Sequence, residues 1–235
     1  SYQIAIGPLT KKGQRVRFSH LAIDEVQDFS PIEIETLLDC CDKHQCVTLA
    51  GDTRQHISKE AGFSSWTSFL QDLGVETNAL HTLEISYRST HSIVRFAQLL
   101  LDNDEEPPPR TLKEGPEVEL FTFSDHGACV GYLADKLSEL MYQEPLANIA
   151  IISPNDEVGR MYYEGFQRTE LASLRLIENQ KFSFLPGIDI VNVNDIKGLE
   201  FDYVIIIEAS RLFYPSTPHY RRLLHVAATR AVHQL

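Results

Sequence analysis

The sequence is poor in cysteine, in long apolar runs and in net positive charge. It has four cysteines, at positions 40, 41, 46 and 129, and none of them forms a CxxC pair. This spacing argues against a disulfide framework and a cysteine zinc site, and it favours buried free thiols in a reducing compartment. The nine histidines are scattered, so no zinc site is expected from them either. No run approaches the roughly 18 apolar residues of a membrane-spanning helix.

The charge balance also limits the partners. Lysine and arginine number 21 against 33 aspartates and glutamates, which gives a net charge of −12 over 235 residues. A chain this acidic offers no broad electrostatic surface for nucleic acid, so such a contact would be local or lie on parts outside this sequence. Because the sequence opens on Ser1 without an initiator Met, we expect it to be a piece of a longer protein.

Short apolar runs alternate with helical patterns along the chain. We expect strands at 20–24, 46–50, 118–123, 149–153, 188–193 and 203–207, and helices at 31–43, 64–73, 90–101, 127–141, 157–170 and 220–232. Wholly apolar strands that alternate with helices are typical of a parallel sheet covered on both faces. The sequence therefore predicts an α/β fold. Its first helix starts with Ser30 as the N-cap and Pro31 at the first helical position.

Two acids follow the first apolar run. Asp24 and Glu25 stand where ligands bind in open α/β sheets, beyond the carboxyl end of a strand. One carboxylate could hold Mg²⁺ and the next could take a proton from an attacking water. From these residues alone, an acidic turn that caps the helix at Pro31 is an equal alternative.

Four further segments carry side chains suited to phosphate chemistry. Gln55 follows a strand and a glycine and could orient a water, Arg88 and Arg230 could stabilise phosphoryl charge, and Tyr87 could stack on a base. The fourth segment is Asn192–Asp202, between two apolar strands. Each has a plain structural alternative: a solvated turn or a helix arginine. For Trp66, helical spacing with nearby apolar residues favours core packing over base stacking.

Taken together, these segments resemble superfamily 1 DNA helicases of the UvrD/Rep type. The family's boxes are matched, in order, by DEVQD at 24–28, GDTRQHI at 51–57, SYRS at 86–89, KGLEFD at 197–202 and VAATRA at 226–231. The resemblance implies a RecA-like P-loop NTPase core, with part of a first domain in 1–85 and a second RecA-like domain in 86–235. It also implies ATP and Mg²⁺ as cofactors, single-stranded DNA as the track and a cytoplasmic location.

The resemblance also assigns roles to single residues. Asp24 would be the Mg²⁺ ligand and Glu25 would activate the water. The other implied roles are γ-phosphate sensing by Gln27 and Gln55, adenine packing by Tyr87, γ-phosphate contacts by Arg88 and Arg230, and ribose-side contacts by Gly198 and Glu200.

Three departures from the family pattern stand out. The phosphate-cradling GxxxxGK[ST] loop occurs nowhere in the sequence, so we expect this chain alone to bind ATP poorly and to be inactive. Asn192 and Asn194 replace the Thr and His that the family places near DNA. Only 109 residues separate Arg88 from Lys197 (197 − 88), which leaves no room for the large inserted domain and resembles compact, HelD-like branches.

Two functions therefore remain open at this stage. The first is a fragment of an ATP-dependent helicase or translocase. The second is a catalytically silent helicase-like module that binds a protein partner, such as RNA polymerase or a repair nuclease. A phosphate loop upstream in the full reading frame would favour the first.

Overall fold

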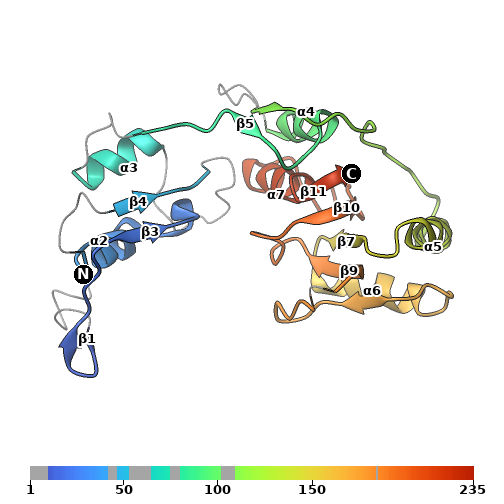
Figure 1. Cartoon of the computed structure of the whole chain (residues 1–235). Coiled ribbons are helices and arrows are strands. Elements are labelled where there is room, and N and C mark those ends of the chain that lie inside the picture. Colours follow the sequence, from blue (N-terminus) through green and yellow to red (C-terminus); the bar gives the residue numbers. More distant parts are fainter. Residues whose placement is uncertain (1–9, 42–46, 53–64, 75–79, 102–108, 184) are drawn as a thin grey trace. The chain divides into compact units, whose positions relative to one another are not determined.

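The computed structural model describes residues 10–41, 47–52, 65–74, 80–101, 109–183 and 185–235 (Figure 1). The chain separates into two compact units, Ser1–Thr82 and Leu83–Leu235. Each unit has its own elements and is described by itself. The assignment of 1–85 and 86–235 to two RecA-like domains stays a prediction.

The first unit is built around a pair of short parallel strands. Its elements are β1 (Thr10–Lys11), β2 (Gln14–Arg15), β3 (Leu21–Ile23), the 3-10 helix η1 (Val26–Asp28), α2 (Pro31–Leu38), β4 (Val47–Leu49) and α3 (Trp66–Asp72). β3 and β4 pair in parallel with Ala22 opposite Thr48, and β1 and β2 form an antiparallel pair. Apolar side chains from β3, η1, α2 and α3 form one core: Ile23, Val26, Ile34, Leu38 and Phe69.

Helix α2 begins as the sequence predicts. The Ser30 hydroxyl accepts a hydrogen bond from the Glu33 N–H at 3.3 Å, and the Glu33 carboxylate accepts one from the Ser30 N–H at 2.8 Å. These bonds satisfy two N–H groups that lack partners inside the helix. The helix ends at Leu38, earlier than the expected 43. The chain leaves it because Cys40 accepts a bond from the Phe18 N–H at 2.8 Å, which draws residues 40 and 41 toward Phe18.

The second unit is an α/β unit around a five-stranded parallel sheet. The sheet order is β11-β10-β7-β9-β8. Its strands are β7 (Asn148–Ser153), β8 (Leu174–Leu176), β9 (Gly187–Asn192), β10 (Phe201–Ile206) and β11 (Ala231–Gln234), and its helices are α4 (His91–Leu100), α5 (His126–Gln143), α6 (Asp156–Phe166) and α7 (Pro218–Ala228). A separate parallel pair joins β5 (Ile85–Ser86) to β6 (Arg110–Thr111). The predicted α/β class with a parallel sheet is confirmed.

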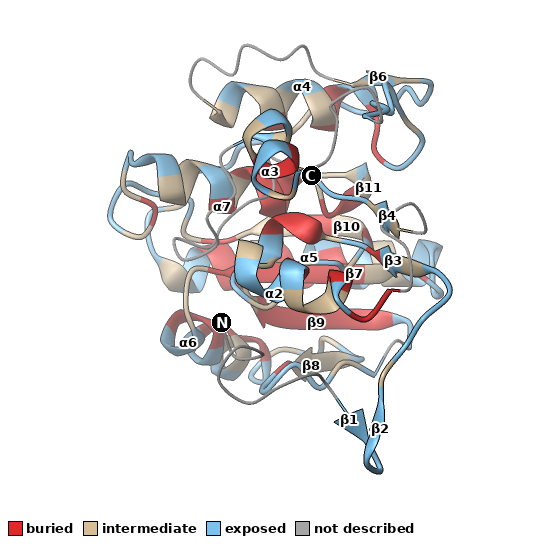
Figure 2. Cartoon of the chain, turned by 90° about the vertical axis from the view of Figure 1, so that its left-hand side faces the viewer, coloured by how far each residue is buried: buried red, intermediate tan, exposed pale blue. Residues whose placement is uncertain are grey.

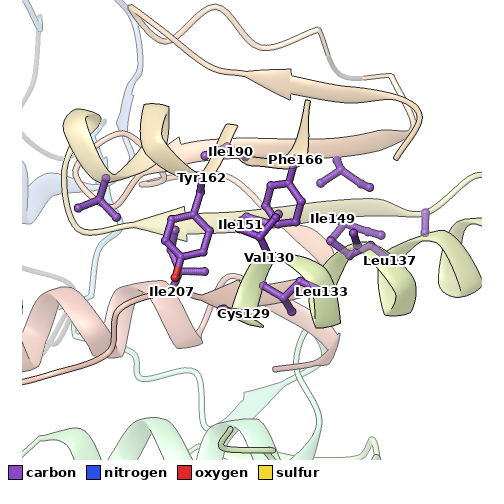
Figure 3. Packing of buried hydrophobic residues seen from close by; sticks show 14 residues of the cluster. Cys129, Val130, Leu133, Leu137, Ile149, Ile151, Tyr162, Phe166, Ile190 and Ile207 are labelled. Carbon is purple, nitrogen blue, oxygen red and sulfur yellow. The ribbon is translucent and has the colours of Figure 1, made fainter. Parts of the chain in front are cut away.

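Alternate residues of the central strands pack in opposite directions. Ile149 and Ile151 of β7 lie in the cluster formed with α5 and α6, together with Ile190 of β9 (Figure 3). Ala150 and Ile152 are equally buried, and strand alternation directs them to the other face. On that face α7 contacts β10, and α4 packs on α7. The central strands are buried along most of their length (Figure 2), which explains why most of their residues are apolar.

One predicted strand is wrong, and one predicted helix is present but ends earlier than expected. Residues 118–123 form no strand although they are rich in apolar side chains. A ladder needs a paired neighbour, and the backbone bond from this segment runs from the Glu119 N–H to the Leu235 carbonyl, one residue beyond the end of β11. The helix predicted at 220–232 ends at Ala228, and β11 takes its place from Ala231. The chain turns there because the Arg230 carbonyl accepts a bond from the Phe201 N–H at 3.0 Å, which starts the pairing with β10.

The predictions for the cysteines and for Trp66 are confirmed within the part of the chain that the structure describes. Cys40, Cys41 and Cys129 are buried free thiols, and position 46 lies outside the described residues. Trp66 packs on the core of the first unit, edge to face with Phe69 at a centroid distance of 6.0 Å. Among the described helices, none has the length and apolar character that a membrane crossing needs.

Candidate functional site

The acid pair lies at the carboxyl end of β3. Asp24 is exposed and Glu25 is half-buried. Beyond the strands, the Ala50 N–H donates to the Ile23 carbonyl at 2.8 Å and the Val26 N–H donates to the Ala50 carbonyl at 2.9 Å. These bonds hold the segment after β4 beside the segment after β3, so the first two boxes meet at one sheet edge.

Glu25 adopts a left-handed backbone conformation, with φ of 52°. Its N–H donates to the Asp24 carboxylate at 2.8 Å. A non-glycine residue in this region is uncommon and costs about 1–3 kcal/mol, and such strain gathers at functional sites. β3 ends at Ile23, and the left-handed turn at Glu25 interrupts the side-chain alternation of the extended strand.

Gln27 is completely buried and connects the two segments. Its side-chain N–H donates to the Glu25 carboxylate, and its side-chain oxygen accepts from the Asp52 N–H at 3.0 Å. Gly51 makes room for it, because a Cβ at that position would lie 2.3 Å from the Gln27 oxygen. The family resemblance implied that Gln27 senses the γ-phosphate; in this structure its amide bonds to Glu25 and Asp52. The predicted catalytic residue Gln55 lies outside the described residues.

The other candidate side chains lie in the second unit, where three boxes meet. Arg88 forms an ion pair with Glu200, and both side chains are about half exposed. The Arg88 carbonyl accepts a bond from the Lys113 ammonium at 3.0 Å. The buried Ser89 hydroxyl donates to the Ala231 carbonyl at 2.7 Å. The SYRS segment is thereby tied to β11, and Lys113 is a contact that no motif in the sequence signalled.

Two further candidates are neighbours of this ion pair in the sequence: Tyr87 directly precedes Arg88, and Gly198 lies two residues before Glu200. Tyr87 is 67% exposed, so its ring is open to a ligand. Gly198 has φ of +78°, a conformation that glycine adopts without steric cost, and it turns the chain just before Leu199 and Glu200.

Arg230 is buried, with 1% of its surface exposed. Its guanidinium donates to the Val226 carbonyl at 3.1 Å and to the Leu199 carbonyl at 3.3 Å. Arg230 therefore joins the end of α7 to the residue before Glu200. To reach a nucleotide, the guanidinium would have to leave these two carbonyls.

A pocket of about 410 Å³ lies at the carboxyl ends of β7 and β9. Asn192 donates to the Asp156 carboxylate at 2.7 Å, and Asn194 donates to the Asn192 side-chain oxygen at 2.9 Å. Gln180 donates to the Asp195 carboxylate at 3.0 Å. The two asparagines that depart from the family pattern thus belong to a network of amides and carboxylates.

Comparison with known proteins gives the family context. Residues 187–235, which hold the KGLEFD and VAATRA boxes, match the UvrD-like helicase C-terminal domain. The resemblance to UvrD-like helicases is confirmed. Over 162 residues the chain is 22% identical to YjcD of Bacillus subtilis, a protein described as an ATP-dependent DNA helicase, and the match covers 66% of this chain. Over 186 residues it is 24% identical to DNA helicase II of Haemophilus influenzae, covering 74% of this chain.

A solved structure supports the fold of the second unit. It is the C-terminal domain of a possible DNA helicase from Lactobacillus plantarum, with 27% identity and a TM-score of 0.53. The match covers 64% of this chain and 84% of that domain. By contrast, the chain spans only 21% of YjcD and 25% of DNA helicase II. It corresponds to a limited part of these UvrD-like relatives.

Proposed function

We propose that this chain is part of the motor of an ATP-dependent DNA helicase or translocase of the UvrD type. The complete protein would couple ATP hydrolysis to movement along single-stranded DNA in the cytoplasm. The observation that carries the proposal is the strained Asp24–Glu25 turn at the end of β3, beside the segment after β4. Its support comes from the similarity to UvrD-like helicases and from the relatives described as DNA helicases.

The first unit supplies a metal ligand and a base in this proposal. Mg²⁺ binds proteins through one or two carboxylates and completes its shell with water and substrate phosphates. The exposed Asp24 carboxylate fits this requirement. When bound, the ion would neutralise charge on the phosphates. Glu25 would take the proton of the attacking water, and Gln55 would orient that water.

The second unit supplies the cations and the nucleotide-base contact. Arg88 would stabilise charge on the γ-phosphate, which requires that its ion pair with Glu200 open. Glu200 and the turn at Gly198 would then lie on the ribose side, and Tyr87 would pack on the adenine. Arg230 would join Arg88 at the phosphate after leaving its carbonyl partners.

The test is ATP hydrolysis by the complete protein, measured with and without single-stranded DNA. We expect DNA to stimulate turnover and Glu25→Gln to lower kcat by about 10²–10⁴-fold, because the general base is lost. Glu139→Gln is the matched control, since Glu139 lies on α5 and pairs only locally with Lys136. Full turnover in Glu25→Gln would remove Glu25 from this role.

The same assay decides between the two functions left open by the sequence. A complete protein that neither binds nor hydrolyses ATP would favour the silent module that binds a protein such as RNA polymerase or a repair nuclease. The 235-residue chain on its own is expected to bind ATP weakly in either case, because its sequence contains no GxxxxGK[ST] loop.

A further inference from the structure

We propose that Gln27 is a positioning residue: its buried amide fixes the Glu25 carboxylate against the Gly51–Asp52 segment and does not itself contact the nucleotide. The inference rests on the proposed function for the role of Glu25. It differs from the role that the family resemblance implied for Gln27, which was to sense the γ-phosphate directly.

The two ends of the Gln27 side chain have different partners. The amide N–H meets the Glu25 carboxylate, which can only accept, and the amide oxygen meets the Asp52 N–H, which can only donate. A primary amide is a neutral group that donates from its nitrogen and accepts at its oxygen, so it matches both partners. Glutamate keeps the acceptor and loses the donor, and methionine loses both. The two partners therefore explain why glutamine stands here.

Burial makes this contact costly to lose. Gln27 has no exposed surface, and a buried amide without hydrogen bonds costs free energy. Gly51 leaves the space that the amide occupies, since a Cβ there would also approach Val26 Cγ1 at 3.0 Å. Gly51 is not among the glycines with positive φ, so this close approach is the reason for glycine at 51. Gln27 and Gly51 thus form one arrangement.

This arrangement has a consequence for catalysis. The Glu25 backbone lies in a strained turn, and the Gln27 amide binds the Glu25 carboxylate and restricts its orientation. A displacement of about 1 Å at a reacting group can cost about 10²-fold in rate. The Gln27 amide forms a bridge between Glu25 and Asp52, because it bonds to both. A shift of the Gly51–Asp52 segment is therefore transmitted to Glu25.

The first test needs no nucleotide and uses the 235-residue chain. Hydrogen exchange of the Asp52 amide is measured by NMR in wild type, Gln27→Ala, Gln27→Glu and Gly51→Ala. We expect exchange to become about ten-fold faster or more in Gln27→Ala and Gly51→Ala, and to stay near wild type in Gln27→Glu, which keeps an acceptor. Gly131→Ala is the control, because a Cβ at 131 meets nothing within 4 Å. Unchanged exchange in both Gln27→Ala and Gly51→Ala would overturn the bridge.

The second test uses the complete protein and separates positioning from nucleotide contact. Gln27→Glu is expected to lower kcat by about 10²-fold with the KM for ATP within about two-fold of wild type, because an interaction that serves the transition state is lost. Gln27→Met replaces it if the glutamate variant does not fold. A raised KM with unchanged kcat would assign Gln27 to the nucleotide and overturn the inference. Absence of ATP hydrolysis in wild type would reject the proposed function. The hydrogen exchange of the Asp52 amide tests the Gln27–Asp52 contact independently of that outcome.

Discussion

At the scale of single residues, the absence of a Cβ atom at Gly115 allows its segment to approach the start of α4. Gly115 lies against Thr90, and a Cβ at position 115 would be 2.4 Å from the Thr90 methyl carbon. The same segment holds α4, since the Ser92 hydroxyl donates to the Gly115 carbonyl at 3.3 Å and the His91 N–H donates to the Lys113 carbonyl at 2.9 Å. Gly115 itself is exposed, but the buried Thr90 side chain leaves no space for a methyl group on its inner side.

Gly115→Ala is therefore expected to lower the free energy of unfolding by about 1–3 kcal/mol, because the new methyl group overpacks the contact with Thr90. Urea unfolding of the 235-residue chain measures the change. Gly131→Ala serves as the comparison: it lies in open space on α5 and should stabilise by up to about 1 kcal/mol through helix propensity. Equal effects of the two variants would contradict the packing argument.

At the scale of an element, α2 depends on both members of its capping box. The Glu33 pKa is lowered, first by the Ser30 N–H and then by the Ser30 hydroxyl. A carboxyl with a lowered folded-state pKa contributes stability that is full above its unfolded pKa and is lost as the pH falls through the folded value. The box therefore makes the start of α2 weaker in acid.

Ser30→Ala is expected to lower the free energy of unfolding by about 1 kcal/mol at neutral pH, because the Glu33 N–H loses its acceptor. Thermal unfolding measures it, with Ser138→Ala as the control at an exposed position inside α5. In the same assay, wild type and Glu33→Gln should differ near neutral pH and converge below the lowered Glu33 pKa. A difference that grows in acid would contradict the assignment.

At the scale of the whole molecule, the second unit has the parts of an independent domain. Its five-stranded sheet is covered by α5 and α6 on one face and by α7 with α4 on the other. Its core includes fully buried side chains such as Ile149, Ile151 and Phe166. Burying each of these side chains contributes about 1.5–3 kcal/mol to stability. The match to the solved helicase C-terminal domain covers 84% of that domain.

Residues 83–235 alone are therefore expected to fold with one cooperative unfolding transition. Circular dichroism and a dispersed NMR spectrum measure this directly. Ile151→Ala should lower the free energy of unfolding by about 2–5 kcal/mol, because it leaves a cavity in the sheet core. A molten, non-cooperative species from residues 83–235 would show that this unit needs the first one.

The sequence by itself determined the α/β class, the helix start at Ser30, the buried thiols and the resemblance to UvrD-like helicases. These properties depend on residue types and on their spacing along the chain, and both can be taken from the sequence without knowing the fold. The same pattern misplaced residues 118–123 and 231–234, because an edge strand forms only where a partner strand offers free hydrogen-bonding groups.

Only the tertiary structure decided how the candidate site is held together. The amide of Gln27 meets Asp52, 25 positions away in the sequence, and Arg88 meets Glu200, 112 positions away (200 − 88). No spacing rule predicts such pairs, since they depend on where the sheet edges bring the loops. The candidate residues were recognised from sequence motifs, whereas the pairs that they form by hydrogen bonds and ion pairs depend on the fold.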